Sequence, residues 1–417
     1  MKTEDIFSLP PEEKNQLQLE RLQSTLNRAC RQVDFHRRRM ADHGIDPAGI
    51  ETLSDIARLP FLNRADFSEH YPYDLFAVPL RDIVRIHTAP GTTRNPTVSG
   101  YTAQDLSTWR QMTARALGAA GVTPHDILQI ALNPGLANWG RDYKEGAEEM
   151  GVSVIPNTPL SMEKQFMVLR DYKTTVLITT PMMADYLAEY REKSGLHRDT
   201  LSLHTVILTG ETVTGEFRRS LEERLRVKVW LHYGLSDVPG AAIAFECKTR
   251  DGLHVNEDHF LPEIIHPETG SPLPAGQTGE LVLTTLTTRA FPLIRFRTGD
   301  RARLLEETCP CGCTLARIEW YAHRTDDIMN IDGVSVHGRQ VRHTLESTLP
   351  IGPETFDLRV GCKEGRKCLE VDLPMNNTIF SDEIKELERL LRGTENRLRE
   401  NLGIPVMIRL VEPKRRS

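Results

Sequence analysis

The sequence predicts an α/β protein with mostly parallel sheets, because short β-branched or apolar runs alternate with segments of helical periodicity in the middle of the chain. Gly, Pro and Thr turns become frequent from about residue 252 and predict a β-rich subdomain. The final part combines strand-like runs with one charged helix, which predicts a small α+β domain. We expect a large N-terminal domain of several subdomains over residues 1–322 and a small C-terminal domain over 323–417.

The individual elements follow from periodicity. Residues 12–43 carry leucines at helical spacing among many charges and are expected to form an N-terminal helical brace. The expected strands are 126–132, 152–156, 175–180, 205–210, 227–234, 279–286, 358–360, 369–373 and 405–412, with a charged helix at 381–401.

Composition indicates a globular metabolic enzyme. The chain has 417 residues, of which 39% are hydrophobic and 26% charged, enough for more than one core. The net charge of −6 provides no basic field, so we expect no nucleic-acid partner. The first residues lack a signal-peptide core, and no apolar run reaches the length of about 18 residues that spans a bilayer. We expect a cytoplasmic protein with small-molecule substrates and no membrane partner.

Two expected strand ends carry residues suited to ligand binding. In open parallel sheets, ligands collect at the carboxyl ends of the strands. Gly210 and Glu211 follow one strand, and 232-HYGLSD-237 ends another. The sequence therefore predicts a ligand site at this edge of the sheet.

The stretch 87-HTAPGTTRNPTVSGYT-102 is a candidate phosphate-binding loop. Gly91 would let the backbone approach a phosphate, and Thr92 and Thr93 offer hydroxyl and amide donors. The same composition is typical of an ordinary turn, which is the competing interpretation.

The cysteines indicate a metal site. Cys309 and Cys311 form a short knuckle, and 247-CKTRDGLH-254 supplies Cys247 and His254 from a distant loop. Three cysteines and one histidine make a closed tetrahedral Zn²⁺ site of the structural kind.

Three alternatives remain open for these residues. Cys313 could replace one ligand, and His259 could compete with His254. The cysteines could also be buried thiols without a metal.

Seven motifs in order resemble the phenylacetate-coenzyme A ligase-like branch of the adenylate-forming enzymes. The resemblance covers residues from about Leu26 to Val411 and rests on HTAPGTTRNPTVSGYT, TGE, YGLSD, FECKTRDGLHVNEDHFLPEII, GELVLTTLTTRAFPLIRFRTGD, CPCG and HRTDDIMNIDGVSV. It implies that the large domain binds ATP, Mg²⁺ and a carboxylic acid and forms an acyl adenylate and pyrophosphate. It further implies that the small domain is a mobile lid that turns so that a thiol, coenzyme A, accepts the acyl group. Several relatives hold zinc at the positions of the cysteines and histidine.

The loop departs from the family pattern Ser-Ser-Gly-Thr-Thr-Gly-Lys-Pro. Ala89 and Pro90 stand at the two serines, Arg94 at the second glycine and Asn95 at the lysine. Arg94 restores a cation and could hold phosphate in a bidentate fork, so we expect an altered cradle with a catalytic Arg94.

The resemblance assigns the nucleotide site residue by residue. Gly210 and Glu211 would border the adenine, Tyr233 would stack against it, and Gly234 belongs to the same segment.

Three further polar residues complete that assignment. Ser236 would lie near the phosphates, and Asp237 would replace the metal-binding glutamate and hold Mg²⁺. Asp300 would bind the ribose hydroxyls.

The C-terminal lid is implied to turn about Asp326, with Arg324 beside it. Gly333 matches the segment that approaches the thiol. Relatives carry a catalytic lysine near their C-terminus, and Lys414 in 411-VEPKRRS-417 is the candidate here. A solvated basic terminus is the competing interpretation.

Three functions remain open. The first is adenylation of an aryl acid followed by coenzyme A thioester formation, with the acyl pocket lined by 133-NPGLANWG-140 and the segment around Pro181. The second is adenylylation of a different substrate, such as a deazaflavin coenzyme. The third is a degenerate relative that binds nucleotide without catalysis. A homodimer is possible in each case.

Overall fold

The computed structural model describes residues 6–89, 95–132, 137–156, 158, 160–195, 201–235, 240–326, 328–331, 334–349, 356–363, 366–374 and 384–411. Among the described helices, none combines the length and the apolar character that crossing a membrane requires.

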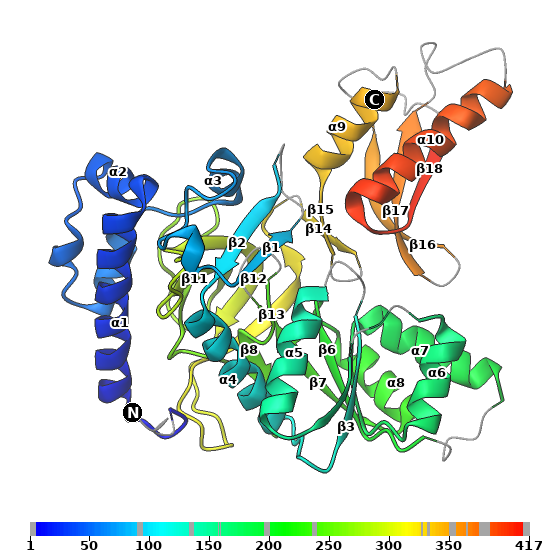
Figure 1. Ribbon diagram of the computed structural model, residues 1–417, viewed down its shortest axis with the longest axis horizontal. Helices are drawn as coiled ribbons and strands as arrows, with labels where there is room; N and C mark the ends of the chain where they lie inside the picture. The colour runs from blue at the N-terminus through cyan, green and yellow to red at the C-terminus, as the bar shows by residue number, and fades with distance from the viewer. Residues whose placement is uncertain are drawn as a thin grey trace.

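Helices α1 (Pro11–Gln32) and α2 (Asp34–Asp42) lie along one side of the molecule (Figure 1). Pro11 opens α1, and Glu12 and Glu13 stand in its first turn, where acidic side chains stabilise a helix N-terminus. Val33 has an extended backbone and separates the two helices. The helical prediction for 12–43 is therefore correct in type, but the segment is divided in two.

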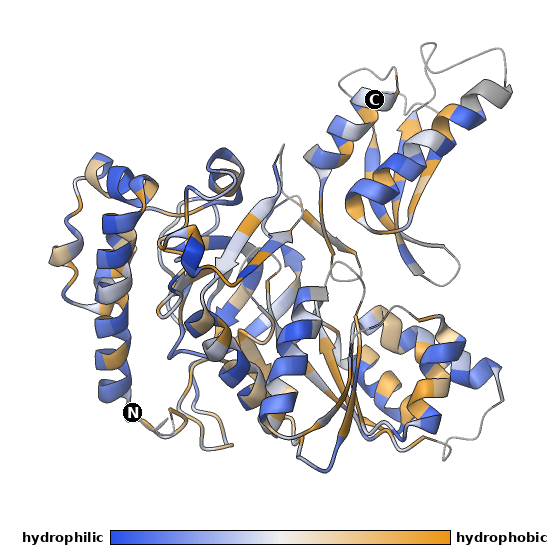
Figure 2. Cartoon of the chain, viewed as in Figure 1, coloured by the Kyte–Doolittle hydropathy of each residue, from blue (hydrophilic) through white to orange (hydrophobic). Residues whose placement is uncertain are grey.

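Helix α1 braces the rest of the fold, as expected. Its buried Leu22, Leu26 and Ala29 pack in one apolar cluster with Leu286. The Thr25 hydroxyl donates a 2.9 Å hydrogen bond to the carbonyl of Leu286. Most residues of α1 are hydrophilic (Figure 2).

A short hairpin follows several small elements. These elements are η1 (Pro47–Gly49), η2 (Leu53–Arg58), α3 (Arg64–Glu69) and η3 (Leu80–Asp82). Strands β1 (Arg85–Ala89) and β2 (Thr97–Tyr101) then pair antiparallel. Both ends of the expected phosphate loop are thus strands, and only the part between them can serve as a loop.

One large sheet forms the centre of the molecule. Within the described residues its order is β10-β11-β12-β13-β9-β8-β7-β6-β5-β3-β4. The strands β3 (Ile127–Ala131), β4 (Ser153–Ile155), β5 (Val176–Thr179), β6 (Thr205–Thr209) and β7 (Lys228–Tyr233) are parallel to one another. Strands β5 and β6 are buried throughout, which is typical of parallel strands covered on both faces.

The rest of this sheet is antiparallel. It contains β8 (Ala244–Glu246), β9 (Leu253–Val255), β10 (Phe260–Ile265), β11 (Thr278–Thr285), β12 (Phe296–Leu304) and β13 (Arg317–Arg324). The predicted α/β class is confirmed, with a refinement: the β-rich part continues the same sheet, because β7 pairs with β8.

Five helices connect or flank the parallel strands. They are α4 (Ala103–Ala119), α5 (Ala137–Glu149), α6 (Met162–Asp171), α7 (Pro181–Lys193) and α8 (Gly215–Leu225). Helices α4, α7 and α8 begin with a threonine whose side chain accepts a backbone hydrogen bond, at Thr102, Thr180 and Thr214.

The C-terminal part stands beyond the main sheet (Figure 1). It contains β14 (Ile328–Ile331), β15 (Val334–His337), α9 (Gly338–Thr348), β16 (Asp357–Lys363), β17 (Arg366–Pro374), α10 (Ile384–Leu402) and β18 (Val406–Val411). Strands β16, β17 and β18 form a small sheet, and the buried apolar residues of this part form their own cluster between 331 and 408. The expected domain border at 322–323 falls within β13.

Candidate active site

The carboxyl ends of β6 and β7 meet at one edge of the sheet. Thr209 pairs with His232 in the ladder, so Gly210 and Tyr233, which follow them, lie side by side. Gly210 has a φ of +91°, a conformation that glycine adopts without strain. The two segments that the sequence singled out are therefore neighbours, as the strand-end rule requires.

Gly234 lies in a tightly packed position next to Tyr233. A Cβ atom at residue 234 would lie 3.0 Å from the carbonyl oxygen of Gly240 and 3.3 Å from the ring of Trp139. A larger residue would push this edge of the sheet away from α5.

Tyr233 is buried, with 0% of its surface exposed. Its hydroxyl donates a 2.7 Å hydrogen bond to Oδ2 of Asp300, and its ring meets the Trp320 ring edge-on at 4.9 Å between centroids. In this conformation the ring offers no accessible face to an adenine, contrary to the expected stacking geometry. Stacking by Tyr233 would require its neighbours to move.

Asp300 lies on β12 and is 2% exposed. Its Oδ1 accepts a hydrogen bond from Arg324, which is close to fully buried. Burial raises the pKa of the Asp300 carboxyl, and the Arg324 charge opposes that effect. The two residues thus form a buried ion pair, and Tyr233 supplies a further hydrogen bond to the carboxylate.

The expected hinge residue Asp326 belongs to the same network. Arg324 donates through Nε to Oδ1 of Asp326 at 2.7 Å and through a terminal nitrogen to Oδ2 at 2.8 Å. Although burial lowers the pKa of Arg324, the carboxylates of Asp300 and Asp326 raise it above its ordinary value. Arg64 at the start of α3 adds a 3.2 Å contact to Asp326.

Gly299 makes this network possible. Its φ is +72°, and a Cβ atom there would lie 2.0 Å from Oδ2 of Asp326 and 2.5 Å from a terminal nitrogen of Arg324. Because the charged groups pack directly on the Gly299 backbone, a side chain at residue 299 would displace them.

A cavity of about 530 Å³ lies between the main sheet and the C-terminal part. Glu211, Thr212 and Trp320 line it from the main sheet, and Met329 and Lys367 line it from the other side. Lys367 forms an ion pair with Glu211. Asp300, Arg324 and Asp326 also border this cavity, so the residues expected at the nucleotide and hinge sites share one space.

Sequence reasoning missed three contributors to this site: Arg64, Trp320 and Lys367. None of them stands in a motif, and each makes its contact across a long stretch of chain. The charged run 363-KEGRK-367 is the only signal that the sequence contains for Lys367, and it does not indicate a partner.

The predicted metal ligands come together. One ligand atom from each of Cys247, His254, Cys309 and Cys311 lies within 4.8 Å of the others. Nδ1 of His254 lies 3.2 Å from the carbonyl oxygen of Leu315, so a protonated Nδ1 can donate a hydrogen bond to it. In that tautomer Nε2 carries no proton and can serve as the metal ligand that faces the thiols. Burial lowers the pKa of His254, which favours the neutral imidazole that a metal requires.

The structure also decides between the alternative ligands. Nδ1 of His259 lies 2.8 Å from the Thr287 hydroxyl, and its Nε2 lies 3.2 Å from Asp258, outside the cluster. Cys313 donates its amide to Sγ of Cys311 at 3.3 Å, but its thiol is not one of the four clustered atoms.

The N-terminal brace secures the loop that carries the cysteine knuckle. The ammonium of Lys14 lies 2.6 Å from the Glu257 carboxylate and 2.8 Å from the carbonyl of Thr314. Glu257 also accepts the amide of Ala316 at 2.5 Å. Since Lys14 and Glu257 are both buried, this contact ties α1 to the knuckle.

Several expected site residues lie outside the described residues: Gly91, Thr92, Thr93, Arg94, Ser236, Asp237, Gly333 and Lys414. Asn95, directly after the loop, is described. Its side-chain amide donates a 3.1 Å hydrogen bond to the carbonyl of Ser68. The base of the loop is thus attached to α3, which begins with Arg64.

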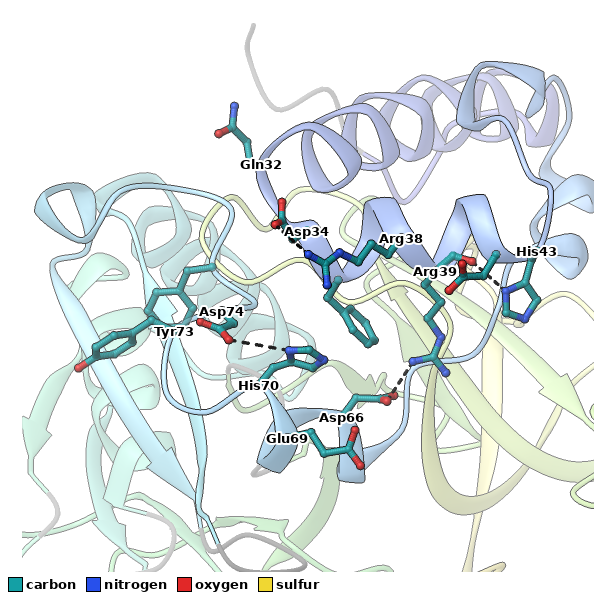
Figure 3. A pocket seen from close by; sticks show the side chains of 13 residues that line it. Gln32, Asp34, Arg38, Arg39, His43, Asp66, Glu69, His70, Tyr73 and Asp74 are labelled. Atoms are coloured by element: carbon teal, nitrogen blue, oxygen red, sulfur yellow. Dashed lines mark hydrogen bonds and ion pairs between the residues drawn. The ribbon is translucent and has the colours of Figure 1, made fainter.

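A second cavity of about 830 Å³ lies between α2 and α3 (Figure 3). Its charged side chains contact one another: Arg39 lies 3.0 Å from Asp66, and His70 lies 3.9 Å from Asp74. This second cavity shares no residue with the 530 Å³ cavity beside Asp300 or with the cysteine cluster.

Comparison with known proteins identifies relatives. Residues 149–287 match the AMP-binding enzyme family. The chain is 38% identical to a phenylacetate-coenzyme A ligase of Thermus thermophilus, over 98% of this chain and 95% of that protein. It is 41% identical to a phenylacetate-coenzyme A ligase of Pseudomonas putida, over 79% of this chain and 75% of that protein.

The fold is also similar to that of a solved enzyme. A crystal structure of 2-hydroxyisobutyryl-CoA ligase with 2-HIB-AMP and CoA, in the thioesterification state, has a TM-score of 0.91 and 23% identity. The same ligase in the postadenylation state has a TM-score of 0.73 and 22% identity. Both alignments cover 99% of this chain and 89% of the other.

Proposed function

The chain belongs to the phenylacetate-coenzyme A ligase family of AMP-binding enzymes, and from this premise we propose that its acid substrate is an aryl carboxylic acid. Its reaction is that of an acid-coenzyme A ligase: ATP activates the carboxylic acid as an acyl adenylate, and coenzyme A then accepts the acyl group. The observation that carries this function is the Tyr233–Asp300–Arg324 network at the carboxyl end of β7, in a chain similar over 98% of its length to such a ligase.

We propose that Asp300 accepts hydrogen bonds from the ribose hydroxyls of ATP and that Gly210 and Glu211 border the adenine. A carboxylate oxygen has more than one lone pair, so Asp300 can accept from a ribose in addition to Tyr233. The hydrogen bond from Tyr233 holds the carboxylate in a fixed orientation. Trp320 and Thr212, which line the same cavity, would be further nucleotide neighbours.

For the phosphates we propose the segment Gly91–Thr93 with Arg94, and Asp237 as the ligand of Mg²⁺. A hard Mg²⁺ ion suits a carboxylate together with phosphate oxygens and water. A guanidinium near the transferred phosphoryl group would stabilise the charge that develops there. Lys414 is the alternative source of that charge.

We propose that Cys247, His254, Cys309 and Cys311 hold a structural Zn²⁺. Three thiols and one imidazole, all within 4.8 Å of one another, are the donor set of a closed structural site, and the Leu315 carbonyl orients the imidazole of His254. The metal would join the β8–β9 hairpin, which carries Cys247 in its loop and His254 on β9, to the knuckle after β12. Cysteines that serve as metal ligands suit a reducing compartment, so we also propose a cytoplasmic location.

We propose that residues 323–417 act as a lid that turns about Asp326. The separate apolar cluster of the C-terminal part supports movement as one body. The TM-scores of 0.91 with the thioesterification state and 0.73 with the postadenylation state of 2-hydroxyisobutyryl-CoA ligase support a lid that adopts more than one arrangement.

The decisive experiment is a substrate screen. Purified protein is supplied with ATP, Mg²⁺ and aryl acids, fatty acids or deazaflavins, and pyrophosphate release is measured before and after coenzyme A is added. The proposal predicts pyrophosphate with aryl acids and a thioester when coenzyme A is present. Activity with deazaflavins alone would favour the second function, and nucleotide binding without turnover would favour the non-catalytic one.

A further inference from the structure

Lys367 connects the C-terminal part to the candidate nucleotide site. It is the second residue of β17 and follows Arg366, which pairs with Lys363 at the end of β16. Its ammonium forms an ion pair with the Glu211 carboxylate, and its backbone amide lies 2.6 Å from the sulfur of Met182 at the start of α7. Lys367, a residue of the small sheet, thus contacts both the segment that follows β6 and the first turn of α7.

The ion pair between Lys367 and Glu211 is less exposed to water than an ordinary surface ion pair. The Lys367 side chain is 35% exposed and that of Glu211 is 12% exposed, so water screens the pair only in part. Glu211 lines the same cavity as Asp300 and Arg324. The ion pair therefore closes one side of the space where the ribose carboxylate and the hinge network meet.

The pair depends on the position of the C-terminal part. Lys367 lies on β17 of the small sheet, whereas Glu211 follows β6 of the main sheet and Met182 lies in α7. The present arrangement is similar to that of the 2-hydroxyisobutyryl-CoA ligase structure in the thioesterification state, with a TM-score of 0.91. A turn of the lid away from this arrangement would move Lys367 relative to Glu211, because the two residues lie on different parts of the molecule.

We propose that Lys367 is a positioning residue for the thioester-forming step, because its ion pair with Glu211 holds the lid in the arrangement in which coenzyme A attacks. This inference rests on the proposed ligase function. Because Lys367 and Glu211 lie on the two parts that would move relative to each other, their ion pair would stabilise the arrangement in which they meet. Loss of about 1 kcal/mol from a partly screened pair changes the ratio of two conformations about fivefold.

The test separates the two half-reactions in Lys367→Met, which keeps an unbranched side chain but removes the charge. Adenylation is measured as acid-dependent pyrophosphate exchange without coenzyme A. Thioester formation is measured in a single turnover, when coenzyme A is added to enzyme that carries preformed acyl adenylate. We expect thioester formation to slow about three- to tenfold, with adenylation unchanged or slightly faster. Lys367→Arg should restore most of the thioester rate.

Arg359→Met is the matched control. Arg359 lies on the neighbouring strand β16 and pairs with Asp372 of the same small sheet, and Arg409 also holds Asp372. This variant should leave both half-reactions at the wild-type rate. Equal losses in the two half-reactions of Lys367→Met, or no loss in either, would overturn the positioning role.

A readout without turnover keeps the inference separate from the ligase proposal. Hydrogen exchange of the amides near Met182 and Lys367 should be faster in Lys367→Met than in wild type or Arg359→Met, with melting temperatures unchanged. If wild type activates no acid, the ligase function fails, and the exchange result still decides whether Lys367 holds the lid. Exchange that is identical in all three proteins would contradict that contact.

Discussion

The hydroxyl of Tyr233 donates a 2.7 Å hydrogen bond to Oδ2 of Asp300, whose other oxygen accepts a hydrogen bond from Arg324. Arg324 in turn holds both oxygens of Asp326 at 2.7 and 2.8 Å. Residues from three separate motifs therefore form one chain of contacts. A ligand that changes the hydrogen bonds of Asp300 would act directly on Arg324, which also holds Asp326, the proposed hinge residue.

This relationship predicts how nucleotide stabilises the protein. ATP with Mg²⁺ should raise the melting temperature of wild type by mass action. Asp300→Asn keeps the shape of the side chain but removes the charged acceptor that we propose for the ribose hydroxyls, so most of the ATP-induced shift should disappear. Thermal unfolding with and without ATP measures both shifts. Asp126→Asn, at the amino ends of the strands, should keep the full shift, and an undiminished shift in Asp300→Asn would place the nucleotide elsewhere.

The cysteine cluster predicts metal content. Purified protein prepared without chelators should carry about one zinc ion per chain by elemental analysis. Cys311→Ser should lose the metal and lower the melting temperature by roughly 5 °C or more, because two distant loops lose their link. Cys30→Ser, a cysteine of α1 outside the cluster, should keep the zinc. A wild-type preparation free of zinc would remove this assignment.

Asp142 on α5 predicts a specific pH dependence of stability. The carboxyl is buried, and burial raises its pKa from 3.8 to about 7, against the opposing charge of Arg85. The folded state therefore keeps a proton that the unfolded chain releases between about pH 4 and pH 7. The stability due to neutral Asp142 is fully present below pH 4 and is lost as the pH rises to 7.

Asp142→Asn tests this dependence because asparagine does not titrate. At about 1.4 kcal/mol for each pKa unit, the free energy of unfolding of wild type should fall relative to the variant by up to roughly 4 kcal/mol between pH 4 and pH 8. Denaturant unfolding of both proteins across this range gives the difference, and the effects of other groups cancel. Parallel pH profiles would show that the pKa of Asp142 is not raised.

The candidate phosphate loop predicts an order of importance for two cations. Arg94→Ala should slow adenylation by about two orders of magnitude, the loss expected for one preorganised charge in the transition state. Lys414→Ala should have a smaller effect, because Arg94 belongs to the proposed phosphate segment itself and its planar guanidinium can hold a phosphate in a bidentate fork. Pyrophosphate exchange measures both rates, with nucleotide affinity as the control. The reverse order would assign the charge to Lys414.

The sequence was sufficient to predict a helix or strand wherever the pattern of its residues is local. The apolar run at 205–210 became β6, and the charged helix expected at 381–401 became α10. The helix expected over 12–43 was interrupted at Val33, and β2 was missed within a stretch of turn-forming residues. Both errors arise because weak local preferences yield to tertiary packing.

What the sequence determined by itself is the α/β class, the strand ends that carry Gly210 and Tyr233, and the two short motifs, 247-CKTRDGLH-254 and the Cys309–Cys311 knuckle, that supply candidate metal ligands. Each depends on residue type and short spacing, which the chain contains directly. Only the tertiary structure decided that Tyr233 is buried against Asp300, that His259 stays outside the metal cluster and that Lys367 meets Glu211. These contacts join residues far apart in the chain, and their geometry depends on how strands and loops pack, which no local pattern encodes.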